Sequence, residues 1–215
     1  MALVPVRSTA PSYFEITDAD AIQIQTTLMK EWEPKREVWS LRYGDFIVGA
    51  NAGISGLIIN SMFRKKLKLL HHGLIYTTCL TVAPVFIATI NHNYFITKRL
   101  LLYDTDCSMC QYLKAISSSQ FASIIFPLMT APLIHLSIAV NLGFRVPYVT
   151  EVREVLKFWW NTVKPSSKRL LLLSIGNCAI ATVIVYKQSN AIDNVKHILL
   201  RIQEKIDDGT ISLKK

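Results

Sequence analysis

Apolar residues along this chain of 215 residues gather into four long runs that contain no Lys, Arg, Asp or Glu. A helix needs about 20 such residues to cross the roughly 30 Å hydrocarbon core of a bilayer. Backbone amides in lipid must be paired internally, and the chain lacks the short alternating segments of a membrane barrel. We therefore predict an all-α fold, a polytopic membrane helical bundle with four transmembrane helices over residues 46–63, 74–96, 121–142 and 170–186.

The first of these runs carries a stripe of small and polar residues at helical spacing. Gly49, Gly53, Gly56 and Asn60 recur at steps of four, three and four residues, so they share one side of a helix. Small residues let helix backbones approach closely in lipid, and a carboxamide can form a hydrogen bond across the contact. We predict that this stripe packs against another helix.

The periodicity of polar and apolar residues predicts further helices outside the four runs. Residues 150–164 place apolar side chains on one helical face, and Trp159 and Trp160 suit the boundary between membrane and water. This segment is expected either to lie on the membrane surface or to contact a soluble partner. The membrane domain thus covers residues 46–186 and follows an N-terminal extension, residues 1–45, that contains a helical segment.

Residues 187–215 form a C-terminal segment with the pattern of an amphipathic helix. Its apolar positions recur at steps of three and four residues, which produces a seam for another helix or for the membrane surface. We favour a partner protein as the occupant and expect Leu199 and Ile202 to contact it. The seam consists of Ile192, Val195, Leu199, Ile202 and Ile206.

Composition agrees with a membrane protein, because 51% of the residues are hydrophobic, 18% are charged and the mean hydropathy is +0.30. A single soluble α-domain is the alternative, but the grouping of the apolar residues argues against it. The net charge of +9 comes with no nucleic-acid-binding motif, so we expect anionic membrane lipids as partners and no nucleic acid. The cations near the spans divide almost evenly between the two sides, which leaves the orientation open.

The connection between the second and third spans contains a pair of cysteines, Cys107 and Cys110. Two thiols at this spacing can form a disulfide, remain reduced, act as a catalytic dithiol, or share a metal with a ligand such as His92. A tetrahedral zinc site needs four ligands, and the other two cysteines lie inside predicted spans. We therefore predict no metal site and favour a structural disulfide or a free thiol pair.

Other polar residues inside the spans indicate helix packing. Asn51, Asn60, His135 and Asn177 should face other helices, because an unpaired polar group is costly in lipid. A proton or ion path usually includes acidic or basic residues, and none lies in the middle of a predicted span. The chain also lacks a Walker loop, a dinucleotide-binding fingerprint, a GxSxG motif and an HExxH motif. We predict no catalytic residue and no cofactor, and hence no enzyme.

Three blocks of residues resemble the transmembrane protein 126 family. The first, Ile47–Arg64, has Asn, Gly, Leu, Asn, Ser, Phe and Arg in the order of the family's first-span signature. The second is Asp106–Cys110, and the third contains Phe158, Trp159, Thr162, Lys164 and Pro165. The resemblance covers about residues 47–186, and both ends of the chain diverge from it.

The resemblance implies a multi-pass protein of the mitochondrial inner membrane that assists the assembly of respiratory complex I without catalysing a reaction. Its implied partners are subunits of the complex I membrane arm and other complex I assembly factors. The motifs do not assign the chain to one of the family's paralogues. Two alternatives remain open, a small carrier or lipid-handling protein that uses the polar residues of the bundle, and a redox protein built around Cys107 and Cys110.

Overall fold

The computed structural model describes residues 17–67, 78–102, 107–144 and 151–207, and all secondary structure in this part of the chain is helical. The predicted all-α fold is therefore confirmed. Here η1 and η2 are short π-helical segments and η3 is a short 3-10 helix. The elements are α1 Asp18–Glu31, α2 Trp39–Lys66, α4 Cys79–His92, η1 Asn93–Thr97, α5 Lys98–Leu101, α6 Ser108–Gln120, η2 Phe121–Ile125, α7 Phe126–Asn141, α8 Val152–Val163, η3 Lys164–Ser166 and α9 Ser167–Asp207.

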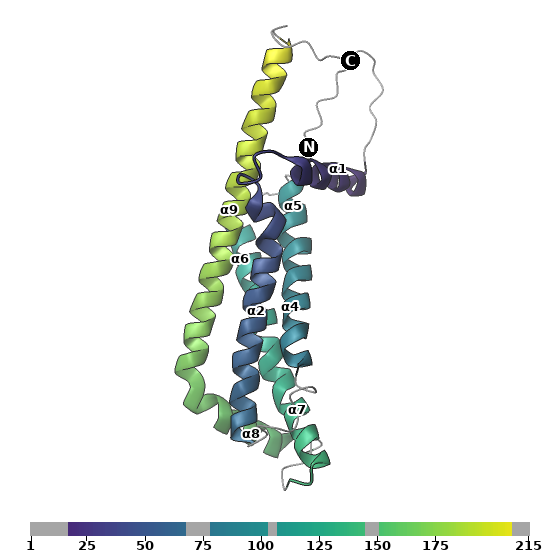
Figure 1. Cartoon of the computed structure of the whole chain (residues 1–215). Helices are drawn as coiled ribbons and strands as arrows, with labels where there is room; N and C mark the ends of the chain where they lie inside the picture. The colour runs from purple at the N-terminus through teal and green to yellow at the C-terminus, as the bar shows by residue number, and fades with distance from the viewer. Residues whose placement is uncertain (1–16, 68–77, 103–106, 145–150, 208–215) are drawn as a thin grey trace.

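Four helical stretches are long and apolar enough to cross a membrane, so the chain is a multi-pass membrane protein. In the bundle, α2 lies between α4 and α9 (Figure 1). The helix α1 lies across the end of the bundle where α2 begins, α8 lies at the opposite end, and α9 extends past the bundle. The four stretches are Trp39–Lys66, Cys79–Leu101, Ser108–Asn141 and Val152–Ile202.

Three layers of buried apolar side chains hold the bundle together along its length. The middle layer consists largely of alanines, and small side chains let membrane helices approach one another closely. The layer nearest to α1 also receives Met29 of α1 itself, so this crossing helix packs on the core. The layers include Leu41, Leu100 and Val185 near α1, Val48, Ala52, Ala88 and Ala122 in the middle, and Ile59, Phe63 and Leu80 near α8.

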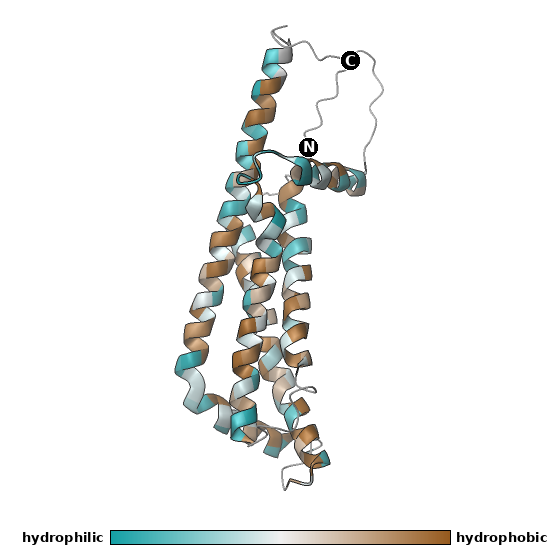
Figure 2. Cartoon of the chain, viewed as in Figure 1, coloured by the Kyte–Doolittle hydropathy of each residue, from teal (hydrophilic) through white to brown (hydrophobic). Residues whose placement is uncertain are grey.

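The outer surface of the bundle is rich in apolar residues, which Figure 2 shows in brown along the helices. Large hydrophobic side chains are exposed on each long helix, for example Phe46, Phe86, Met129 and Leu172. Soluble proteins rarely expose contiguous apolar surface on this scale. The surrounding medium of the bundle is therefore lipid, in agreement with the four spanning stretches.

The third spanning helix begins at Ser108, well before the predicted start at residue 121. Cys107 caps this helix, since the backbone amide of Cys110 donates a hydrogen bond to the Cys107 sulfur at 3.3 Å. Lys114 and several serines interrupt the apolar pattern of α6. A search for uncharged runs therefore misses this part of the helix, although it continues through η2 into α7.

The last helix, α9, is continuous over 41 residues, where the sequence predicted a span over 170–186 followed by a separate segment. Lys187 ends the apolar run but not the helix, because neither Gly nor Pro occurs between Lys187 and Asp207. The last span and the C-terminal seam consequently form a single helix.

Candidate functional site

The glycine stripe of α2 lies directly against α4. A Cβ atom added at Gly53 would lie 2.6 Å from Val85 Cγ2, and one added at Gly56 would lie 2.8 Å from the carbonyl oxygen of Leu80. Cβ atoms in proteins essentially never approach a neighbouring atom this closely, so larger residues would push the two helices apart. Gly49 meets the same helix at Val85. The stripe is therefore occupied by a helix of the same chain.

Polar side chains join α2 to α9 in the middle of the bundle. The side-chain amide of Asn51 donates a hydrogen bond to Asn177 Oδ1, and Asn177 Nδ2 donates one to Ser55 Oγ at 3.1 Å. Asn60 and His135 are buried as well. The contacts among Asn51, Ser55 and Asn177 satisfy polar groups that lipid could not hydrogen-bond, whereas the two ring nitrogens of His135 have no hydrogen-bond partner among the described residues.

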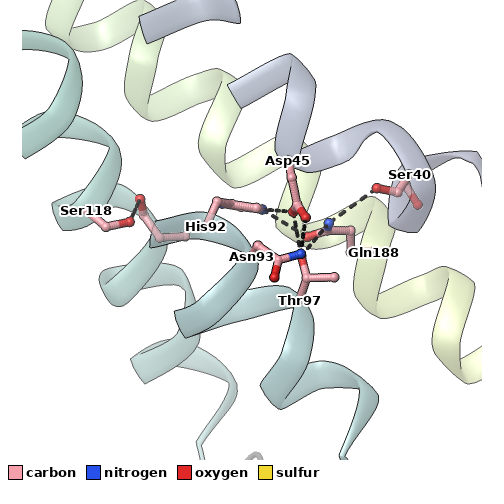
Figure 3. A network of polar contacts seen from close by, with 8 residues as sticks. Ser40, Asp45, His92, Asn93, Thr97, Ser118 and Gln188 are labelled. Carbon is pink, nitrogen blue, oxygen red and sulfur yellow. Dashed lines mark hydrogen bonds and ion pairs between the residues drawn. The ribbon is translucent and has the colours of Figure 1, made fainter. Parts of the chain in front are cut away.

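A larger polar network joins α2, α4 with η1, and α9 at the end of the bundle near α1 (Figure 3). At its centre the Asp45 carboxylate accepts hydrogen bonds from Asn93 Nδ2 at 2.7 Å and from Thr97 Oγ1 at 2.6 Å. His92 Nε2 lies 3.9 Å from the same carboxylate. The Asp45 side chain is only 15% exposed, so these donors compensate for much of its lost hydration.

Gln188 of α9 completes this network. Its Nε2 donates hydrogen bonds to the backbone oxygen of Ser40 and to Thr97 Oγ1, both at 3.2 Å. Its Oε1 is therefore the acceptor for His92 Nε2, which lies 3.1 Å away, and this assigns a proton to that ring nitrogen. Gly44 makes room for the contact, because a Cβ atom there would lie 2.7 Å from Gln188 Nε2. One side chain thus links three helices.

A pocket of about 300 Å³ opens beside the network, between α1, α2 and the helix that runs through η1 into α5. The Asp45 side chain lines this pocket together with Lys30 of α1, Arg42 of α2 and Lys98 of α5. A carboxylate and three cations around one cavity can bind an ion or a polar headgroup, so this end of the bundle is the candidate ligand site.

Sequence reasoning missed this network because its members lie at the ends of different spans. Asp45 directly precedes the first predicted span, and Gln188 follows the last. His92 was considered only as a possible metal ligand beside the two cysteines. A signal was nevertheless present. In an antiparallel four-helix topology the start of the first span, the end of the second and the end of the fourth meet at one end of the bundle.

Cys107 and Cys110 are free thiols at the exposed start of α6. Hydrogen bonds from the Cys110 thiol and from the Cys110 backbone amide lower the pKa of Cys107 below its ordinary value. A lower pKa increases the fraction of thiolate, the nucleophilic form. Among the described residues, no group of three or more His, Cys, Asp or Glu is placed to hold a metal, and His92 belongs to the polar network.

The predicted surface helix corresponds to α8, which packs on the end of the bundle opposite α1. The indole N–H of Trp159 donates a hydrogen bond to the carbonyl oxygen of Leu128 at 3.0 Å and so ties α8 to α7. The side chain of Trp160 is 57% exposed. Trp159 therefore makes a contact within the chain, whereas Trp160 is accessible to the membrane surface or to a partner.

The C-terminal seam divides into a covered and an open part. Ile192 and Val195 are buried in the chain itself. Leu199 is half-buried and lines a small cavity together with Met29 of α1. Ile202 is 44% exposed, and the side chain of residue 206 lies outside the described residues. A docking partner could therefore reach the seam near Ile202.

Comparisons with known proteins place the chain in a family. The sequence model of the family described as transmembrane protein 126 matches residues 20–201. A Drosophila melanogaster protein named transmembrane protein 126 is 32% identical over 193 residues, which cover 88% of this chain and 85% of the relative. Transmembrane protein 126A of Rattus norvegicus is 23% identical, and the aligned part covers 69% of this chain and 74% of the rat protein. The Homo sapiens protein of the same name is 25% identical, and the aligned part covers 64% of this chain and 70% of the human protein. No solved structure matches the chain.

Proposed function

Because this chain belongs to the transmembrane protein 126 family, we propose that it is a non-catalytic scaffold of the mitochondrial inner membrane that helps to build the membrane arm of respiratory complex I. In this role it binds membrane-arm subunits and other complex I assembly factors while they are joined. The family resemblance supports the complex I assignment, and the arrangement of the helices supports the scaffold part of it.

The observation that carries the scaffold role is the length of α9, which extends beyond the bundle (Figure 1). The inner faces of α2, α4 and α9 are occupied by one another through the glycine stripe and the polar network. A partner must therefore dock on outer faces. Leu200 and Ile202 are exposed near the far end of α9, where a protein interface would remove them from water.

The first experiment is capture of the tagged protein from mitochondria in a mild detergent, followed by native-gel separation and identification of the proteins that co-migrate. We expect the protein to co-migrate with partly built membrane-arm intermediates of complex I. Depletion of the protein should make the same intermediates accumulate. A single small species, with complex I unchanged by depletion, would contradict the proposal.

A pair of matched variants tests whether the end of α9 is the docking surface. Leu200→Asp with Ile202→Asp introduces two negative charges on exposed apolar positions and should release the co-migrating proteins. The control, Asn194→Asp with His197→Asp, introduces the same charge at exposed polar positions of the same helix. Both variants should keep the abundance and melting temperature of the parent protein. Equal retention of partners by both would exclude this surface.

The carrier alternative is favoured by one observation, the Asp45 carboxylate that lines a pocket at the end of the bundle. Intramembrane acidic groups commonly belong to proton or ion paths. The purified protein reconstituted in vesicles that enclose a pH-sensitive dye separates the two functions. A scaffold leaves the proton flux at the level of protein-free vesicles, whereas a carrier raises it and loses the increase in Asp45→Asn.

A further inference from the structure

We propose that the pocket between α1, α2 and α5 binds the headgroup phosphate of an anionic phospholipid. The inference does not depend on the complex I assignment, because it rests on the charge, the depth and the lining of this pocket. It specifies where the chain would hold an anionic lipid.

The charge of the pocket favours an anion. Lys30, Arg42 and Lys98 come from three different elements and converge on one cavity. Among the residues that the structure describes, none of these cations forms an ion pair, and the Lys98 ammonium lies 5.7 Å from the ring centroid of Tyr94. Asp45 contributes the one carboxylate of the described lining. Three cations against one carboxylate leave an excess of positive charge.

The Asp45 carboxylate lines the pocket, but it is hydrogen-bonded within the polar network and is not paired with any of the three cations. Its two oxygens accept hydrogen bonds from Thr97 Oγ1 and Asn93 Nδ2. The cations therefore keep their charge available for a group that enters the pocket from outside. A phosphodiester matches this requirement because it is small, always ionised near neutral pH and able to accept several hydrogen bonds at once.

The depth of the pocket selects a lipid as the source of the phosphate. Trp39, Tyr43 and Tyr94 are exposed at this end of the bundle, and such residues are typical of the headgroup level of a membrane. Phe46 and Ile90, about one turn further into the bundle, are exposed apolar residues suited to hydrocarbon. The pocket lies where headgroups are concentrated, and cations near an anionic membrane surface attract lipid phosphate.

The remaining lining fits the glycerol and the first carbons of a lipid. Met29, Leu41 and Leu101 add apolar surface to the pocket, and its volume of about 300 Å³ suits a headgroup but not a whole phospholipid. Helix α1 supplies Lys30 and Met29 and covers the bundle end (Figure 1). A bound lipid would therefore also connect α1 to α2 and α5.

The test uses the full-length protein in detergent and native mass spectrometry during titration with phosphatidylglycerol or phosphatidylcholine. Arg42→Gln with Lys98→Gln should weaken phosphatidylglycerol binding about 30-fold, given the attraction of each cation for lipid phosphate. The control Lys35→Gln with Arg36→Gln removes one lysine and one arginine from exposed positions at the same end and outside the lining. This control should change the affinity for phosphatidylglycerol by less than about twofold. A second variant, Arg42→Lys with Lys98→Arg, keeps both positive charges and should retain binding.

Each other outcome overturns the inference. Equal losses in the pocket variant and in the control would show diffuse attraction to the cationic surface. Equal affinity for phosphatidylcholine would exclude recognition of an anionic lipid. Competition by inorganic phosphate at the concentration that displaces the lipid would identify a free phosphate as the ligand. Parent-like binding by Arg42→Gln with Lys98→Gln, with an unchanged melting temperature, would place the lipid elsewhere.

Discussion

Individual residues determine how closely the helices of this bundle can approach. Lipid surrounds apolar side chains as well as another helix does, so association in a membrane depends on close packing and interhelical hydrogen bonds. Gly56 supplies the first, since the backbone of α4 lies where its side chain would be. Asn177 supplies the second through Asn51 and Ser55.

Gly56→Ala should therefore destabilise the bundle, although alanine is the better helix former. The added methyl group meets the backbone oxygen of Leu80, which cannot rotate away, and overpacking of this kind costs about 1–3 kcal/mol. Gly176→Ala in α9 is the matched control, because nothing lies within 4 Å of a Cβ atom there. Unfolding in detergent should show a lower midpoint for Gly56→Ala alone. Equal midpoints would mean that α4 can move aside.

Cys107 and Cys110 give a second prediction for single residues. In Cys110→Ala the Cys107 sulfur loses the hydrogen bond from the thiol at position 110, so the pKa of Cys107 rises towards its ordinary value. The thiolate fraction falls, and alkylation of Cys107 by iodoacetamide at about pH 8 should slow several-fold. Met109→Ala changes the exposed neighbour and serves as control. A parent-like rate in Cys110→Ala would show that the thiols do not interact.

At the scale of helices, the network around Asp45 and Gln188 fixes three elements relative to one another. Gln188 reaches the backbone of α2 and the side chains of His92 and Thr97, whereas Asp45 reaches Asn93 and Thr97. Sliding one helix along another would break several of these bonds at once. The network therefore sets the register at the end of the bundle that carries α1.

Gln188→Leu tests this function of the network. Leucine fills a similar volume but removes the bonds to Ser40, Thr97 and His92, and each buried polar group left without a partner costs about 1–3 kcal/mol. We expect a clear loss of thermal stability in detergent. Asn190→Leu, an exposed polar residue of the same helix, should have little effect. If Gln188→Leu is as stable as the parent protein, glycine and alanine packing alone holds the register.

Some elements could be predicted from sequence, and others could not, for identifiable reasons. Uncharged runs locate the four spans, because the cost of charge in lipid acts on each residue locally. The start of α6 is polar and charged, so its helix depends on the cap at Cys107 and on packing against α9. Its start could not be predicted from hydrophobicity.

The candidate site was less predictable than the spans. Asn51 and Asn177 were expected to face other helices, and they are hydrogen-bonded to each other. The pairing of Asp45 with Asn93 and Thr97 depends on how three helices meet in space, and no local pattern contains that information. The pocket beside Asp45 depends further on α1, which crosses the bundle end.

At the scale of the whole molecule, four spanning helices place both ends of the described chain on one side of the membrane. The start of α2, the start of α6 and the far half of α9 lie at that side, whereas α8 and the end of α2, which includes Lys65, lie at the other. The distribution of cations does not determine which of the two aqueous sides each end of the bundle faces. The orientation can be determined by labelling with a reagent that cannot cross the membrane.

Single cysteines introduced at Leu200, Ile175 and Lys65, in a background in which the native cysteines are serine, test this arrangement. Leu200→Cys lies beyond the bundle and should react with a membrane-impermeant maleimide from one side, and Lys65→Cys should react only from the other. The side chain of Ile175 is 58% exposed, and we expect it to face lipid. A cysteine at this position should therefore remain unlabelled until detergent is added. Labelling of positions 65 and 200 from the same side would mean that an even number of spans lies between them, which contradicts the three spans of this arrangement. Labelling of position 175 without detergent would mean that water reaches this face of α9, and the bundle would then be open where the apolar surface predicts lipid.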